Sequence, residues 1–394
     1  MKKQTKFSLI ALLIISAIAF TCLFTGCNQP PQGSENGGFT SQSVPTTSAQ
    51  RVAPSSTGDA VYFATNAQDF QSGLTLAETS TIRYIYYVGE SMKGNFYTTN
   101  PKAKELKIIG AIGDISISRT LPTNQNQAVD SANNFYQVKY SIENCTFTGS
   151  GSNGINLNCC YASIRDCNFN GKDTSINLTF CMNAQIINNQ VINSKKGGIC
   201  LSVGTNKWRG AGNSTSASNH PLLEGNRVFN MEGAEFGVAL IGLSGGWIQN
   251  HISEGKSPIY HIIINDLNST TAWNYNLNNI HLESIATGAG FLIKSRQSIV
   301  NIVSPYVQYP MTLIDASSYA GVVQVNVENL CWQPSGTKYS STGNCRFRFK
   351  DLYNTGRVDS SFYWIGGKMP NVLCQENLTA NGLVVKNYVN GKLK

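Results

Sequence analysis

Pairs of charged side chains recur in short segments that separate apolar stretches of this 394-residue chain, and such pairs can perform acid–base chemistry. In chain order the pairs are Lys172 with Asp173, Lys195 with Lys196, Glu232 with Glu235, and Glu254 with Lys256. Hydrolysis of a glycosidic bond uses two carboxyl groups, whereas a lyase needs a base and a cation that neutralises a uronate. Glu232, Glu235 and Glu254 are therefore candidate catalytic residues. The alternative is a solvated ladder of alternating charge.

Aromatic and basic side chains gather in two longer segments, 204–220 and 266–276. An aromatic ring can stack on the apolar face of a sugar ring, and Arg or Lys can pair with uronate or sulfate groups. We therefore predict that these segments contain substrate-binding residues for a polysaccharide. The five candidates are Lys207, Trp208, Arg209, Trp273 and Tyr275. The alternative is that the aromatic residues only seal the loops onto the core.

Histidine and cysteine residues give weaker indications of a catalytic or metal-binding role. His251 and His281 alternate with apolar residues and are expected to point outward, and no Ser or Cys nucleophile is visibly paired with a histidine. Cysteines recur 22 residues apart, Cys145 before Cys167 and Cys159 before Cys181, as small buried residues would in a repeat. Cys331 and Cys345 lie outside this repeat and are the best candidates for a disulfide. No spacing suits zinc, and we expect no metal or other cofactor.

A repeated six-residue template indicates how these residues are positioned. Its first position is apolar, two spacer residues follow, the fourth position is a small residue or Asn, and after one more spacer the sixth position is apolar. In later copies the fourth position is also apolar. Copies start at Ile142, Ile164, Ile186, Leu223, Trp247, Leu277, Ile299 and Val322, which are 22, 22, 37, 24, 30, 22 and 23 residues apart. The fourth places of the third, fourth and fifth copies are Asn189, Asn226 and Asn250, whose amides could bond along a stack.

A second short strand follows most copies, with alternating apolar pairs such as Ile155/Leu157 and Ile176/Leu178. Because one such unit cannot bury its apolar face alone, a period near 22 predicts stacked rungs that bury a continuous core. We therefore predict an all-β chain folded as a parallel β-helix. The steps of 37 and 30 place the two longer loops on the same side of the coil, two rungs apart.

The pattern resembles the right-handed parallel β-helix of the pectin-lyase-like superfamily over roughly residues 60–330. "TIRYIYYVGE" at 81–90 and "ELKIIGA" at 105–111 are similar to the N-terminal entry of that superfamily. The resemblance implies a lyase, a hydrolase, an epimerase or a tailspike. The catalytic motifs of polygalacturonases and pectate lyases are missing, so no catalytic residue is carried over, and a fold alone does not specify a function.

The N-terminus resembles a bacterial lipoprotein signal. Lys2, Lys3 and Lys6 precede an apolar run that ends in "LFTGC" at 23–27, which predicts a signal peptide over 1–26 and diacylglycerol on Cys27. An uncleaved membrane anchor and an ordinary secretory signal are the alternatives. Residues 27–59 are expected to form a flexible tether, 60–330 the β-helix, and 331–394 a C-terminal cap.

The net charge of the chain limits the classes of binding partner that we expect. The chain carries 30 basic and 22 acidic residues, and loss of three signal lysines leaves 27 against 22, or +5, with no dense Lys/Arg block. A nucleic-acid partner is therefore not expected. We predict an extracytoplasmic protein, lipid-anchored to a bacterial membrane or cell surface, that binds a polysaccharide and could cleave it. The alternative is a non-catalytic adhesin, tailspike-like protein or binding scaffold of undefined oligomeric state.

Overall fold

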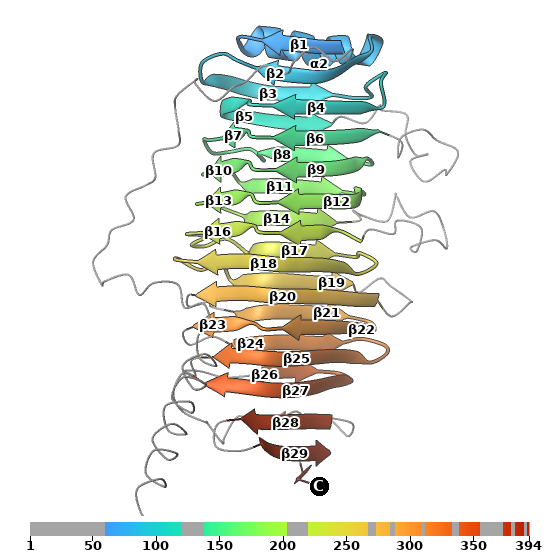
Figure 1. Cartoon of the computed structure of the whole chain (residues 1–394), viewed down its shortest axis with the longest axis vertical. Coiled ribbons are helices and arrows are strands. Elements are labelled where there is room, and N and C mark those ends of the chain that lie inside the picture. Colours follow the sequence, from blue (N-terminus) through green and yellow to red (C-terminus); the bar gives the residue numbers. More distant parts are fainter. Residues whose placement is uncertain are drawn as a thin grey trace, which may run out of the picture. The chain divides into compact units, whose positions relative to one another are not determined.

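A single continuous parallel sheet of 27 strands coils into a β-solenoid of about nine turns (Figure 1). The computed structural model describes residues 60–119, 138–202, 220–266, 273–283, 288–308, 312–332, 339–354, 373–379, 383–389 and 392–393. The predicted all-β fold class and its parallel β-helix are confirmed. Each turn of the coil contributes strands to three faces, here called face 1, face 2 and face 3.

Face 1 contains the strands that carry the first half of the repeated template. In order of pairing they are β1 (Ala60–Ala64), β2 (Ile82–Tyr87), β4 (Glu105–Ile109), β6 (Lys139–Glu143), β9 (Tyr161–Arg165), β12 (Met182–Ile187), β15 (Leu222–Glu224), the first halves of β18 (Gly246–Glu254) and β20 (Trp273–Glu283), β22 (Ser298–Val303), and the first halves of β25 (Val323–Trp332) and β27 (Cys345–Asn354).

Face 2 contains the strands that come directly after those of face 1 along the chain in each turn. Its strands are the start of β5 (Ile112–Arg119), β7 (Thr146–Phe147), β10 (Asn168–Asn170), β13 (Gln190–Ile192), β16 (Arg227–Phe229), the second halves of β18 and β20, β23 (Tyr306–Gln308), and the second halves of β25 and β27. Along β18 and β20 one strand serves both faces, which places side chains of one strand on two outer surfaces.

Face 3 contains the second strands of the repeat. They are β3 (Met92–Thr98), the rest of β5, β8 (Ile155–Asn158), β11 (Thr174–Thr179), β14 (Gly197–Ser202), β17 (Phe236–Ile241), β19 (Tyr260–Asp266), β21 (Ala289–Ser295), β24 (Thr312–Ser318) and β26 (Tyr339–Thr342). The alternating apolar pairs predicted for these strands are in register, because Ile155 pairs with Ile176, Ile176 with Ile199, and Leu157 with Leu178.

The corner between faces 1 and 2 is made by one residue per turn in the left-handed conformation. These residues are Asn144, Asp166, Asn188, Gly225, Asn250, Asn279 and Ser304, with φ between 51° and 64°. Asn, Asp and Gly reach this region at the lowest steric cost, which explains their recurrence at the corner. The corner therefore comes from local sequence and redirects the chain within a single residue.

The interior consists of ladders of stacked side chains. Ile142, Ile164 and Ile186 pair in register and are fully buried, as predicted. The rings of Phe147 and Phe169 stack with centroids 4.7 Å apart and planes only 6° from parallel. Each buried large apolar side chain contributes about 1.5–3 kcal/mol, so the stack stabilises every turn through its neighbours.

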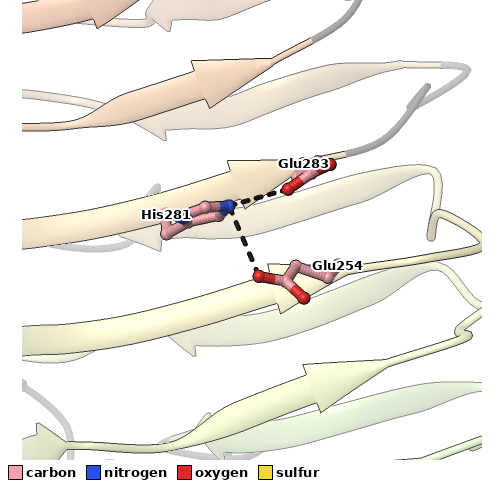
Figure 2. A group of neighbouring side chains, drawn as sticks. All are labelled: Glu254, His281 and Glu283. Carbon is pink, nitrogen blue, oxygen red and sulfur yellow. Dashed lines mark hydrogen bonds and ion pairs between the residues drawn. The ribbon is translucent and has the colours of Figure 1, made fainter. Parts of the chain in front are cut away.

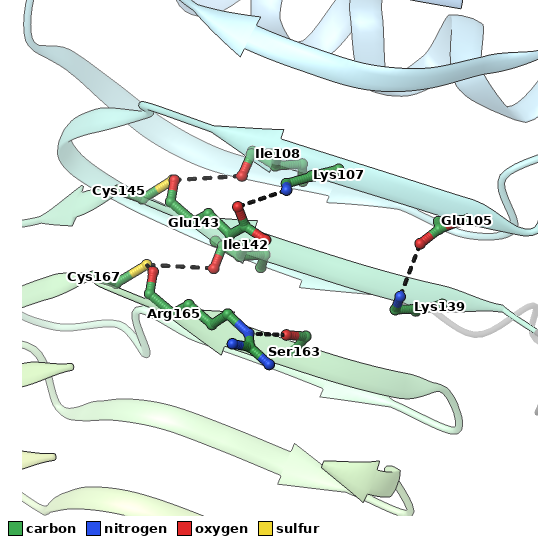
Figure 3. A network of polar contacts seen from close by, with 10 residues as sticks. All are labelled: Glu105, Lys107, Ile108, Lys139, Ile142, Glu143, Cys145, Ser163, Arg165 and Cys167. Atoms are coloured by element: carbon green, nitrogen blue, oxygen red, sulfur yellow. Dashed lines mark hydrogen bonds and ion pairs between the residues drawn. The ribbon is translucent and has the colours of Figure 1, made fainter. Parts of the chain in front are cut away.

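A cysteine and asparagine ladder lies just inside the corner. Cys145 and Cys167 are buried, and their thiols face the carbonyl oxygens of Ile108 and Ile142 in the preceding turns (Figure 3). Asn189 continues the ladder and donates from Nδ2 to the carbonyl of Ile164 at 3.0 Å. Burial raises the pKa of the Cys167 thiol well above its usual value, which suits a structural role rather than a reactive one.

Asn226 extends this ladder by one turn. It donates from Nδ2 to the carbonyl of Ile186 at 2.7 Å and accepts from the backbone N–H of Asn189 at 3.0 Å. The predicted amide ladder is therefore confirmed for Asn189 and Asn226. The second cysteine pair differs from the prediction, because Cys160 and not Cys159 stacks on Cys181, with the sulfur atoms 3.7 Å apart.

Outside the ladders, face 1 carries ion pairs between consecutive turns. Lys107 contacts Glu143 at 2.7 Å and Lys139 contacts Glu105 at 2.9 Å (Figure 3). Within β9, the strand of the next turn, Arg165 donates a hydrogen bond to the hydroxyl of Ser163 at 3.0 Å. These pairs are partly exposed and contribute little individually, but they match charges along the stack.

The template is out of register in its fifth copy. Ile248, not Trp247, pairs with Leu223 and Leu277 in the interior, while Trp247 points outward with 47% of its surface exposed. Asn250 is consequently a corner residue. His251 occupies the next position of the ladder formed by Asn189 and Asn226, and it is buried. The predicted outward position of His251 is therefore wrong. A shift of one residue exchanges the two faces of a strand.

The seventh and eighth copies are also shifted. Ile302 and Val327, rather than Ile299 and Val322, continue the interior column of Leu277. The predicted disulfide is wrong as well. Cys331 pairs opposite Tyr353, whereas Cys345 pairs opposite Val323, eight positions away along β25. Eight extended residues span about 26 Å, and a disulfide needs Cα atoms within about 7 Å.

One helix, α2 (Ala67–Thr79), covers the first turns of the coil and contacts β1, β2 and β3 (Figure 1). Its N-cap is Asn66, whose side chain accepts from the backbone N–H of Asp69. The buried residues Phe70, Leu74 and Ala77 lie on one face. Their spacing is typical of an amphipathic helix, and the strand-based analysis missed it. A helix here shields the sheet edge from pairing with other chains.

Parallel pairing continues through β27 to Asn354, beyond residue 330 where the coil was expected to end. A separate antiparallel sheet consists of β28 (Leu373–Thr379), β29 (Leu383–Val389) and β30 (Lys392–Leu393). The capping role of this region stays a prediction. The predicted signal peptide, Cys27 and the tether lie outside the described residues. Within the described ranges, no helix has the length and apolar character needed to cross a bilayer.

Candidate functional site

Three ionisable side chains meet on the outer surface of face 2. Glu254 lies at the end of β18, and His281 and Glu283 lie at the end of β20 on the next turn. The register pairs Glu254 with Glu283, and Ile252 with His281. Because alternate residues of a strand face opposite sides, Ser253 and Leu282 point into the core while these three point outward.

His281 lies between the two carboxylates. Its Nε2 is 3.4 Å from Oε1 of Glu254 and 3.1 Å from Oε2 of Glu283 (Figure 2). One ligand atom from each residue lies within 4.8 Å of the other two. The side chains of His281, Glu254 and Glu283 are 17%, 28% and 36% exposed, so the cluster is partly buried and still accessible to solvent.

The two glutamates have different environments. Burial raises the pKa of Glu254 above its usual value, and the negative charge of Glu283 raises it further. His281 and Arg227 act in the opposite direction without cancelling this shift. Glu254 is therefore the better candidate for a proton donor, and the more exposed Glu283 is left as the candidate for the second role in the pair.

Side chains from the adjacent turns frame the cluster. Arg227 on β16 pairs in register with Ile252, two residues before Glu254, and is exposed. On the other side, Tyr306 on β23 pairs in register with His281, and the two rings lie 4.7 Å apart at an angle of 38°. Contact with Tyr306 restricts the orientation of the imidazole, which holds Nε2 toward the carboxylates.

This arrangement supports two kinds of chemistry. Two close carboxyl groups in different environments can act as acid and as base or nucleophile. One imidazole and two carboxylates can also serve as ligands of a divalent cation that accepts nitrogen and oxygen donors, such as Zn²⁺ or Mn²⁺. The sequence analysis predicted no metal site, because Glu254 lies one turn away from His281 and Glu283 and joins them only through the register of β18 on β20.

The structure brings one of the three predicted catalytic residues into this cluster. Glu232 is strongly exposed and pairs with Lys256 at 2.7 Å, and Glu235 is exposed in the same turn. Asp173 and Lys196 form a similar pair at 2.7 Å between consecutive turns. These segments therefore match the alternative of a solvated charge ladder, whereas Glu254 lies beside a second carboxylate.

Lys172 departs from that pattern. Its side chain is fully buried, with Nζ 3.5 Å from both Asp114 Oδ1 and Ser152 Oγ. Burial lowers the pKa of Lys172, and the charge of Asp114 acts against that shift. The contacts join three turns of the coil, which indicates a structural role.

The predicted substrate-binding residues divide into three groups. Lys207, Trp208 and Arg209 lie outside the described residues. Trp273 is half-buried and packs against the core. The prediction that Tyr275 binds substrate is wrong, because its side chain is fully buried and its hydroxyl donates a hydrogen bond to the carbonyl of Leu243 at 2.9 Å.

The two longer segments do begin at the same edge of face 3. β14 ends at Ser202 and β19 ends at Asp266, and both strands pair with β17, which lies between them. The predicted separation of two turns is thus confirmed for the residues that precede the segments. Asp266 itself is fully buried, and burial raises its pKa to about 7.

The sequence analysis missed His281 and Glu283 as site residues, although a signal existed. His281 was expected to point outward, which is confirmed, but it was assigned no role. Glu283 follows Glu254 by 29 residues, as Leu277 follows Ile248, so a correct register would have aligned the two carboxylates. A Ser–His contact was also missed: Ser253 Oγ lies 2.6 Å from His261 Nδ1, but both residues are buried in the coil and closed to a substrate.

Comparison with known proteins identifies no relative of this chain. No family model, curated protein or solved structure shows significant similarity to this chain. The resemblance to pectin-lyase-like proteins is therefore supported only at the level of a parallel β-solenoid. The function has to be argued from the surface of the coil.

Proposed function

We propose that the protein binds a polysaccharide along its coil and hydrolyses glycosidic bonds at Glu254 and Glu283. The observation that supports this proposal is the pair of carboxyl groups with oxygens within 4.8 Å and with different environments. Retaining glycosidases place their two carboxyl groups about 5–5.5 Å apart, whereas inverting enzymes need more room for a water molecule. The spacing therefore favours the retaining mechanism.

In this mechanism protonated Glu254 gives its proton to the glycosidic oxygen as the bond to the anomeric carbon breaks. Glu283 attacks that carbon and forms a glycosyl ester, and the leaving sugar departs with the proton. Glu254, now a carboxylate, takes a proton from water, which attacks the ester and releases Glu283. His281 contacts both glutamates and holds their orientation throughout.

The same three side chains favour a second candidate, cleavage assisted by a divalent cation. Here Glu254, His281 and Glu283 would hold the ion, which would supply Lewis-acid chemistry at a substrate oxygen. A metal dependence separates the two candidates, because direct acid–base hydrolysis survives chelation. Addition of Zn²⁺ or Mn²⁺ after chelation should restore activity only in the metal-assisted case.

The experiment uses the purified chain and a panel of neutral and uronic-acid polysaccharides, with and without chelator. Hydrolysis releases reducing ends, and a lyase instead raises ultraviolet absorbance through a new double bond. Glu254→Gln and Glu283→Gln should each lower the rate at least about 100-fold, the lower end of acid–base contributions. Glu232→Gln, an exposed glutamate outside the cluster, is the matched control and should leave the rate unchanged.

Binding without any product would instead favour the non-catalytic adhesin, tailspike-like protein or scaffold. Full activity of both Glu254→Gln and Glu283→Gln would exclude the cluster as the catalytic centre. The proposal further places the protein outside the cytoplasm, tethered to a bacterial membrane or cell surface through Cys27. It does not include nucleic acid as a partner.

A further inference from the structure

Trp247 presents its ring to solvent on face 1. It is 47% exposed at an outward position of β18, and the ring of His220 lies beside it at 6.1 Å. In the preceding turn its register partner is Leu222, and in the following turn it is Asn276. A single exposed aromatic residue is common on protein surfaces, so Trp247 acquires significance only through its neighbours.

A row of amides runs along face 1 and ends beside Trp247. Asn326 donates from Nδ2 to Asn301 at 2.8 Å, and Asn301 donates from Nδ2 to Asn276 at 2.9 Å. Every donation in the row is directed toward the preceding turn. The next place is Trp247, which cannot accept this bond, and no described residue accepts from Nδ2 of Asn276. A hydrogen-bond donor is thus left at the edge of the exposed indole.

The next outward positions beside this donor carry amide side chains in the part of the chain that the structure describes. Gln249 and Asn278 form the next outward row, paired in register two residues beyond Trp247 and Asn276. The nearest carboxylate in the register is Glu224, which pairs with Gln249 from the preceding turn. Its negative charge disfavours an anionic ligand, while amide side chains can donate to and accept from hydroxyl groups.

We infer that Trp247 and Asn276 form a binding subsite for an uncharged polysaccharide, one sugar ring stacking on the indole and its hydroxyl groups bonding to the amides. An aromatic face beside hydroxyl-bonding groups is the surface that a pyranose ring complements, because the ring has an apolar face and a polar edge. The inference rests on the proposed function, since it names the class of polysaccharide and the place where it is held.

The subsite is connected to the candidate catalytic cluster by one strand. Glu254 follows Trp247 by seven residues on β18, which is at most about 24 Å of extended chain, with the Asn250 corner between them. A glycan of several sugars that lies on Trp247 and crosses this corner would reach face 2. Binding and cleavage are therefore separable, because they use different faces of the coil.

The test measures binding of the full chain to soluble neutral polysaccharides (a β-glucan, a xylan and a mannan) and to polygalacturonate, by affinity electrophoresis and isothermal titration. We expect a neutral polymer to bind and polygalacturonate to bind at least tenfold more weakly. Trp247→Ala should weaken binding of the neutral polymer at least tenfold, and Asn276→Ala about threefold. Two matched controls should bind as the parent does: Asn326→Ala, the same residue type two turns away, and Tyr319→Ala, another exposed aromatic residue.

The outcomes separate this inference from the proposed hydrolysis. If Trp247→Ala binds the neutral polymer as tightly as the parent, or if only the acidic polymer binds, the subsite is wrong whatever the catalytic result. If Trp247→Ala loses binding while Glu254→Gln and Glu283→Gln retain full turnover, the subsite holds and the catalytic proposal fails. Absence of binding to every neutral polymer also overturns the inference. Circular dichroism of each variant verifies that the fold is intact.

Discussion

Ile164 lies between Ile142 and Ile186 in the interior column of face 1, and all three are fully buried. Ile164→Asp would place an unpaired charge in this close-packed stack, which costs about 3–5 kcal/mol. We expect the variant to unfold without the cooperative transition of the parent, as measured by thermal melting and circular dichroism.

The control for this prediction is Gln185→Asp, which introduces the same side chain at an exposed position of the neighbouring strand. It should change the melting temperature little. An Ile164→Asp protein that melts like the parent would contradict the observed register, because it would require Ile164 to face water.

His251 occupies the place in the ladder that Asn189 and Asn226 fill in the two preceding turns. Its ring is buried, and burial lowers its pKa from 6.5 to about 4. An asparagine at this place could accept from the backbone N–H of Asn226 and donate to the carbonyl of Leu223, as its neighbours do. At this position the sequence therefore departs from the hydrogen bonding of the two preceding turns.

This departure predicts an acid-sensitive contribution to stability. Because the folded pKa lies below the unfolded one, only the unfolded chain takes up this proton as pH falls from about 6.5 toward 4. The stability is present above pH 6.5 and is lost below it, by up to about 3 kcal/mol. His251→Asn should remove this loss and add about 1 kcal/mol from new hydrogen bonds.

Urea unfolding of the parent and His251→Asn between pH 4 and pH 7.5 measures this effect. The difference in unfolding free energy between the two proteins should grow as pH falls. His220→Asn, which changes an exposed histidine, is the control and should show no such trend. A difference that stays constant with pH would show that His251 titrates equally in the folded and unfolded chains.

The stack of turns also determines which surfaces the molecule can offer. Each turn pairs its strands with those of the adjacent turns, so a chemical group recurs or combines along the coil according to register. The paired charges of the turns, the amide row of face 1 and the Glu254–His281–Glu283 cluster all arise in this way. At one end of the coil α2 covers the sheet edge, which leaves the outer faces as the surfaces available for a long ligand.

Attachment of the whole protein to a membrane is predicted to depend on Cys27, which lies outside the described residues. Cys27→Ser removes the thiol that would carry diacylglycerol, so the protein should leave the membrane fraction and retain its fold. Cell fractionation, with circular dichroism of the released protein, measures both. Cys22→Ser changes a cysteine within the apolar run and should leave fractionation unchanged. Unchanged membrane association of Cys27→Ser would favour an uncleaved transmembrane anchor.

The sequence alone was sufficient for the fold and for most of the interior. A period of 22 aligns Ile142, Ile164 and Ile186, and stacked turns bury such a repeat in a continuous core. The second strands were placed in register for the same reason, since Ile155 and Ile176 recur with alternating Leu157 and Leu178. A repeated pattern of apolar residues directly indicates which side chains are buried.

The outer surfaces required the folded coil. The six-residue template matched β18 at Trp247 as well as at Ile248, and only the pairing with Leu223 and Leu277 shows that Trp247 faces solvent. Glu254 and Glu283 are 29 residues apart and become neighbours only through the register of β18 on β20. Outward side chains pack against no core that would constrain their pattern, so their proximity depends on how successive turns align in space.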